Sequence, residues 1–157
     1  MESPRTSSAG NRPLRLTGRE REVLALVEHG LTNAEIARRM SRRRPTVARL
    51  LSNAMTKLGA DRRAQAVVLA AEMPEAAGSA RSSTDHPPAD HHLSEMEADA
   101  RAILRGLAHG KTLGQAAGEL GLSRRTADRR LAHARRALGT DRTVVAVASA
   151  RRRGWLV

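Results

Sequence analysis

Two stretches of the chain share one pattern of apolar and polar positions at the period of an α-helix. Their apolar positions are Val47, Leu51, Ala54 and Leu58 in the first stretch and Ala127, Leu131, Ala134 and Leu138 in the second. The opposite face carries Arg49, Ser52 and Asn53 in the first stretch and Arg125, Arg129, Ala132, His133 and Arg136 in the second. Each stretch therefore predicts an amphipathic helix whose apolar face packs inward and whose basic face points outward.

The two stretches belong to a longer repeat, with corresponding positions 80 residues apart. Identical pairs between residues 21–70 and 101–150 include His29-Gly30 with His109-Gly110, Thr32 with Thr112, Arg49 with Arg129, and Leu58-Gly59 with Leu138-Gly139. A bias toward Arg and Ala would produce chance identities, but it would not align the glycines and threonines. The sequence therefore predicts two copies of one unit.

Capping residues divide each copy into four predicted helices. A Thr or Ser followed three positions later by Glu or Gln is typical of a helix N-terminus, and such pairs are Thr17 with Glu20, Thr32 with Glu35, Ser94 with Glu97, and Thr112 with Gln115. Gly30, Gly59, Gly110 and Gly139 fall where helices should end, and Asp61 and Asp141 are expected to cap the fourth helices. The spacing from each second-helix Thr to the later Gly accommodates a short helix, a tight turn and a longer helix, which is the helix-turn-helix arrangement.

Composition separates these units from their surroundings. Residues 1–13 and 74–92 are rich in Pro, Ser, Gly, Ala and charged residues and can bury little surface. We therefore expect an all-α protein with a disordered tail at 1–13, a first four-helix domain at 14–73, a flexible linker at 74–92 and a second four-helix domain at 93–157. We expect no sensory or phosphoacceptor domain ahead of either copy, because 13 residues are too few to fold into one.

The charge indicates a polyanionic partner. The 157 residues include 28 Lys and Arg against 16 Asp and Glu, for a formal net charge of +12. The basic excess is present in both copies, since residues 14–73 hold 12 basic and 6 acidic side chains and residues 93–157 hold 13 and 6. No apolar run is long enough to cross a membrane and no signal peptide is recognisable, so we expect a cytoplasmic protein without a membrane partner.

Missing residue types exclude several function classes. The absence of cysteine excludes disulfide scaffolds, thiolate metal sites and cysteine nucleophiles. Trp155 is the only aromatic residue, which argues against proteins that stack single-stranded bases on aromatic side chains. A basic helix with hydrogen-bonding side chains instead suits the major groove of double-stranded DNA, where Arg can bond bidentately to guanine. A solvated basic face in an Arg-rich protein is the alternative, and duplication of the face in the same register favours the DNA interpretation.

The motifs of residues 16–70 resemble the DNA-binding domain of LuxR/GerE-type bacterial regulators. The resemblance rests on Leu-Thr-Gly-Arg-Glu at the start, Gly-Leu-Thr-Asn-Ala-Glu-Ile-Ala in the second helix, Thr-Val at the start of the third and Lys-Leu-Gly at its end. Residues 93–151 resemble the same family more loosely, and residues 119–139 also resemble the promoter-binding region of sigma factors. The resemblance implies a sequence-specific DNA-binding transcription regulator that pairs through its fourth helices, either as a homodimer or within one chain.

The resemblance and the outward faces together give candidate DNA contacts. Candidates for base contacts are Ala48, Arg49, Ser52, Asn53, Asp128, Arg129, Ala132 and His133. Candidates for phosphate contacts are Arg43, Arg44, Thr46, Lys57, Arg124, Arg125, Thr126 and Arg136. The turn before the third helix is Ser41-Arg42-Arg43 in the first copy and Gly121-Leu122-Ser123 in the second, so only the second copy keeps an apolar turn residue and a Ser cap. We therefore expect the second recognition helix to be better seated and base discrimination to centre on Arg129.

Other chemistry has little support. His86, His91 and His92 with Asp85 and Asp90 could in principle hold a metal, but they fall in the predicted linker, and we expect neither a metal nor a cofactor. No nucleophile elbow, phosphate loop or paired carboxylates appear, so we expect no enzyme. Arg151-Arg152-Arg153 and Trp155 are expected to form a basic last turn and a cover over an apolar seam or a partner chain. The alternative function is a protein-interaction adaptor that uses the helix-turn-helix to contact RNA polymerase or another regulator.

Overall fold

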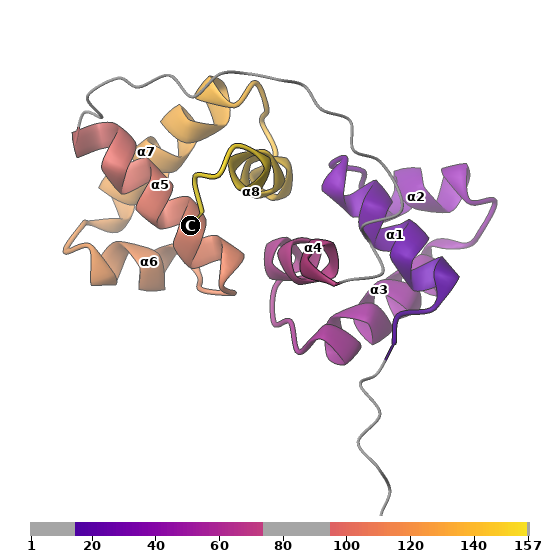
Figure 1. The fold of residues 1–157 in the computed structure, drawn as a ribbon. Helices are drawn as coiled ribbons and strands as arrows, with labels where there is room; N and C mark the ends of the chain where they lie inside the picture. The colour runs from indigo at the N-terminus through magenta and orange to yellow at the C-terminus, as the bar shows by residue number, and fades with distance from the viewer. Residues whose placement is uncertain (1–14, 74–94, 157) are drawn as a thin grey trace, which may run out of the picture.

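The computed structural model describes residues 15–73 and 95–156, and within these ranges the chain forms eight α-helices and no β-strand (Figure 1). The first four are α1 (Gly18–Glu28), α2 (Asn33–Arg39), α3 (Arg44–Leu58) and α4 (Arg63–Glu72). The second four are α5 (Glu95–Ala108), α6 (Leu113–Glu119), α7 (Arg124–Ala137) and α8 (Thr143–Arg152). The all-α prediction is confirmed for this part of the chain. The predicted tail, the predicted linker and the predicted Ser94–Glu97 cap lie outside the described residues.

Helix boundaries follow the capping residues in most cases. Thr17, Thr32 and Thr112 each form a complete capping box, in which the Thr side chain accepts from the backbone N–H three residues on and the Glu or Gln there accepts from the Thr backbone N–H. The four glycines predicted to end helices all have left-handed φ values, between +64° and +85°. Most helices that these residues were predicted to start or end therefore begin and end at the predicted positions.

The predicted caps of the fourth helices are wrong. The N-caps of α4 and α8 are Arg62 and Arg142, and neither makes a side-chain capping bond. Asp61 and Asp141 lie one residue too early, because each fourth helix begins one residue later than the aspartate would require. The Gln65 side chain accepts from the Asp61 backbone N–H at 2.9 Å. Thr140 Oγ1 accepts from the Arg142 N–H at 3.1 Å.

Each group of four helices surrounds its own apolar core. Val23, Val27, Ile36 and Val47 are fully buried in the first core. The predicted inward face of α3 is buried at Val47, Leu51 and Ala54, whereas Leu58 is only half-buried. The corresponding face near α7 is buried at Ala127, Leu131, Ala134 and Leu138. The helical period therefore predicted the packed faces of both third helices, apart from Leu58 at the end of α3.

The two four-helix bodies pack together through α4 and α8, which lie next to each other at the centre of the molecule (Figure 1). Ala64 and Val68 of α4 belong to the core of the second body, and Ala148 of α8 belongs to the core of the first. Each fourth helix therefore completes the core of the opposite body as well as its own. None of the helices in the described ranges has the length and apolar content needed to cross a membrane.

Candidate nucleic-acid interface

The outer face of α3 is exposed to solvent. Ala48, Arg49, Ser52 and Asn53, the four predicted base contacts of the first copy, are all exposed, while Val47, Leu51 and Ala54 hold the opposite side of the helix in the core. The α2–turn–α3 segment therefore presents a rigid helix with a polar face to solvent. Such a helix has the dimensions of the DNA major groove.

The start of α3 is strongly basic and lacks a side-chain cap. Arg43 is the N-cap, makes no capping hydrogen bond and is exposed, as are Arg44 and Thr46. Ser41 in the preceding turn has a left-handed φ of 52°, which non-glycine residues rarely adopt. The predicted loss of a cap in this turn is confirmed, and the N-terminal backbone N–H groups of α3 keep their attraction for an anion.

The start of α7 is built differently. Ser123 Oγ accepts from the Thr126 backbone N–H at 3.1 Å, and Leu122 packs against the second core, as predicted. Gly121 takes the left-handed conformation that Ser41 adopts in the first body, with φ of 64°. The second turn therefore has both the cap and the apolar contact that the first turn lacks.

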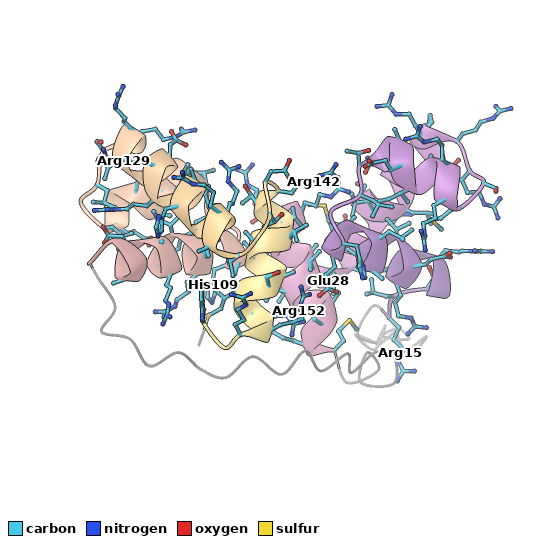
Figure 2. The ribbon with its side chains drawn as sticks, turned by 90° about the horizontal axis from the view of Figure 1, so that it is seen from above. Arg15, Glu28, His109, Arg129, Arg142 and Arg152 are labelled. Carbon is cyan, nitrogen blue, oxygen red and sulfur yellow. The ribbon has the colours of Figure 1, made fainter. Side chains whose placement is uncertain are left out.

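The exposed face of α7 carries an acidic residue among its arginines. Arg129 is exposed and lies on α7 at the end of the molecule away from the first body (Figure 2). Asp128 is exposed and forms an ion pair with Arg124 at 3.4 Å. Of the other candidates, Arg125 and Arg136 are exposed, whereas Thr126, Ala132 and His133 are half-buried. The structure thus brings the predicted residues of the second body onto one helix, with Ala132 and His133 less accessible than Arg129.

Lys57, unlike the other candidate phosphate contacts of the first body, forms an ion pair with a buried carboxylate. Its ammonium lies 2.8 Å from Oε2 of Glu20 and 3.4 Å from the carbonyl oxygen of Arg15, and its side chain is 23% exposed. Burial raises the pKa of the Glu20 carboxyl, but hydrogen bonds from Lys57 and Thr17 outweigh burial and leave that pKa below its ordinary value. Lys57 therefore holds a buried carboxylate, a structural role that the sequence did not indicate.

Three further basic residues, missed in the sequence analysis, extend the surface of the first body. Arg38 and Arg39 in the last turn of α2, and Arg42 in the turn, are exposed next to the start of α3. The corresponding positions of the second body hold Gly118, Glu119 and Leu122, and Glu119 is tied to Lys111 at 2.6 Å. The signal was present as the run Arg-Arg-Met-Ser-Arg-Arg-Arg at residues 38–44. The positive charge is therefore denser around the start of α3, whereas α7 has the side-chain cap that α3 lacks.

The remaining candidates are Trp155 and the potential metal ligands of the predicted linker. Trp155 packs against the second core, and the Arg101 guanidinium lies 4.6 Å from its ring centroid, as expected for a cover over an apolar seam. No group of three or more potential metal ligands occurs among the described residues. The histidines and aspartates considered for a metal, at positions 85–92, lie outside them.

A short helix, a tight turn and an exposed basic helix, packed in a four-helix body, define a helix-turn-helix domain. Residues 14–70 match the model of the family described as "Bacterial regulatory proteins, luxR family", so this part of the chain is one LuxR/GerE-type helix-turn-helix domain, of a family of regulators and not of enzymes. The match ends at residue 70, and it assigns nothing to the second body.

Two curated proteins are similar to the same part of the chain. The "DNA-binding transcriptional activator DevR/DosR" of Mycobacterium tuberculosis (strain ATCC 25618 / H37Rv) is 47% identical over 58 residues, which are 37% of this chain and 27% of the relative. The "Probable transcriptional regulatory protein SgaR" of Hyphomicrobium methylovorum is 50% identical over 54 residues, which are 34% of this chain and 26% of the relative. The chain thus spans about a quarter of the length of the curated relatives it matches. No solved structure matches it significantly.

Proposed function

We propose that this chain is a sequence-specific regulator of transcription that binds double-stranded DNA with two helix-turn-helix modules. The observation that carries the proposal is the exposed, arginine-bearing outer face of α3 within a domain of the LuxR/GerE type. The names of the two relatives describe transcriptional regulators, and the name of the first includes DNA binding. The expected cytoplasmic location and a role without catalysis, metal or cofactor are parts of this proposal.

The second body is a divergent copy of the first in this proposal. Support comes from its helix order, from the capping box of Thr112 at the position corresponding to Thr32, and from the left-handed Gly110 at the position corresponding to Gly30. The packing of α4 against α8 favours pairing of the two copies within one chain over a homodimer through the fourth helices. RNA polymerase is a further partner only if the chain activates transcription.

The two modules have different roles on DNA. The first supplies mainly phosphate contacts, because its five exposed arginines around the start of α3 form a dense positive surface: Arg38, Arg39, Arg42, Arg43 and Arg44. Thr46, Arg124, Arg125, Thr126 and Arg136 are the other proposed phosphate contacts. Ala48, Arg49, Ser52, Asn53, Asp128, Arg129, Ala132 and His133 remain the proposed base contacts. Base discrimination centres on Arg129, because the capped α7 holds this side chain at a fixed depth in the groove.

A binding-selection profile of three alanine variants tests these roles. Arg129→Ala is expected to lower affinity for the preferred site about 5- to 150-fold and to relax the preference at one or two base pairs, from the ~1–3 kcal/mol of a bidentate contact to guanine. Arg136→Ala is the matched control, expected to weaken all sequences alike, and Arg49→Ala should cause the smaller loss of specificity. An unchanged preference in Arg129→Ala with a collapsed one in Arg49→Ala would overturn the assignment.

The salt dependence of binding separates DNA recognition from the adaptor alternative. Neutralising six to eight phosphates at ~0.9 each gives a double-logarithmic slope of about −5 to −7. A packed protein interface shows no such dependence. A slope shallower than about −2 on the preferred DNA, together with retained binding to RNA polymerase, would favour the adaptor.

A further inference from the structure

The contact between the two bodies is made by corresponding residues of each. A Cβ atom added at Gly30 would lie 2.6 Å from Cγ2 of Val145, and one added at Gly110 would lie 2.4 Å from Oε1 of Gln65. Gly30 and Gly110 differ by 80 in number, and so do Gln65 and Val145. The fourth helix of each body therefore lies against the end of the first helix of the other. An interface in which the same positions meet reciprocally is isologous, as in a twofold dimer.

Apart from Val145, which replaces Gln65, the two fourth helices bring a similar apolar composition to this interface. Ala64 and Val68 of α4 pack into the second core, and their counterparts Val144 and Ala148 of α8 pack against the first. Each fourth helix thus contributes one Ala and one Val. Two first bodies, two second bodies or one of each would therefore bury the same two alanines and two valines.

The charged residues at the edge of the interface do differ between the copies. Arg152 donates to Glu28 at 2.7 Å, and Arg151 lies 3.9 Å from the same carboxylate (Figure 2). The counterpart of Glu28 in the second body is Ala108, and the counterpart of Arg152 in the first is Glu72. One edge of the interface therefore has a carboxylate between two guanidinium groups. The other edge has Glu72, which lines a pocket with Ala108, His109 and Arg151 and has no guanidinium at the position that corresponds to Arg152.

We infer that the two α4 and α8 faces are specific for each other, so that the chain pairs with itself and not with a second copy. If two first bodies paired in this geometry, Glu72 would take the place of Arg152 and face Glu28 at both edges. If two second bodies paired, Arg151 and Arg152 would face Ala108 at both edges without an acid. Only the pairing of a first body with a second body places Arg151 and Arg152 beside Glu28. The inference concerns the interface alone and does not depend on DNA binding.

A second charged contact acts against one of the two like pairings. Arg142 donates to the Gly30 carbonyl oxygen and lies 3.4 Å from Glu35. The counterpart of Arg142 is Arg62, and that of Glu35 is Gln115. Two second bodies would lose this ion pair, whereas two first bodies could form it twice. The Arg142–Glu35 pair is half-exposed and contributes little, and forming it twice does not replace the cations that Glu28 loses at both edges of a pair of first bodies.

The test uses the full chain with a protease cleavage sequence inserted after residue 83, within the predicted linker. Native mass spectrometry of the intact protein at micromolar concentration is expected to show a monomer. After cleavage of the folded protein, the two halves are expected to stay together as a one-to-one complex. An intact dimer, homodimers of either half, or halves that separate at once would each overturn the inference.

Charge-reversal variants provide a second test of the inference. Arg151→Glu with Arg152→Glu in the cleavable chain is expected to weaken the association of the halves at least tenfold, and adding Glu28→Arg is expected to restore most of it, since ~1.4 kcal/mol corresponds to a factor of ten. Arg105→Glu is the control, because Arg105 is exposed on the second body and no contact of its side chain with the first is found among the described residues. Equal weakening by the control, or no rescue by Glu28→Arg, would show that position-specific charge does not set the pairing.

Discussion

Replacing Lys57 with Met separates a structural role of this lysine from a DNA-contacting one. Met keeps the length and the buried stem of the side chain but removes the ammonium that lies 2.8 Å from Glu20. The Glu20 side chain is only 4% exposed and would keep its hydrogen bonds from Thr17, of which the one from the backbone N–H is 2.7 Å long. A hydrogen bond to a charged group contributes ~1.5–3 kcal/mol, and removing one partner of a fully buried ion pair costs ~3–5 kcal/mol. Because Lys57 is partly exposed and water can reach the site, we expect a loss of about 2 kcal/mol in the free energy of unfolding.

Urea denaturation of Lys57→Met and wild type at pH 7 and at lower pH measures this loss. The folded-state pKa of Glu20 is lowered, so its contribution is present above the ordinary pKa of 4.5 and is lost as the pH falls through the folded-state pKa. The difference between the two proteins should therefore shrink in acid. Glu20→Gln with Lys57→Met should cost less than the sum of the single variants. Wild-type stability in Lys57→Met, together with a salt slope of DNA binding shallower by about 1, would refute this account and return Lys57 to the phosphate contacts.

Two further predictions concern a cap and a titrating carboxylate. Ser123→Ala removes the 3.1 Å hydrogen bond to the Thr126 N–H and should cost ~1 kcal/mol in urea denaturation, whereas Arg43→Ala, at an N-cap without such a bond, should cost less than half as much. Hydrogen bonds of the Thr32 backbone and hydroxyl, and one from Arg142, lower the pKa of Glu35 to about 2, so its contribution to stability is complete above pH 4.5 and is lost as the pH falls toward 2. The urea midpoint of Glu35→Gln should therefore lie below that of wild type at neutral pH and meet it near pH 2, and a gap that stays constant with pH would contradict this assignment.

Local signals in the sequence were sufficient for most of the fold and for part of the site. A capping box involves residues three positions apart, so Thr17, Thr32 and Thr112 could be assigned without knowledge of tertiary structure. The fourth-helix caps were mispredicted because Asp61 and Asp141 are good caps in isolation, and only the actual start of each helix shows that they lie one residue early.

Contacts between distant residues could not be predicted in the same way. Lys57 and Glu20 are 37 positions apart, and a helical projection shows only that Lys57 is polar, not that a buried carboxylate lies opposite. Glu28 and Arg152 are 124 positions apart in the sequence, and the residues around neither of them indicate that the two side chains meet. Long-range pairing of charges depends on how the bodies pack, which the period of apolar residues does not encode.

The sharing of the fourth helices between the two cores has a consequence for synthesis on the ribosome. Ala148 of α8 belongs to the first core, but it is added 80 residues after Val68, its counterpart in α4. The first body therefore leaves the ribosome with a gap in its core and with Ala64 and Val68 uncovered until the second body has been made. During that interval Ala64 and Val68 form an exposed apolar surface on the nascent chain, which is the kind of surface that chaperones bind.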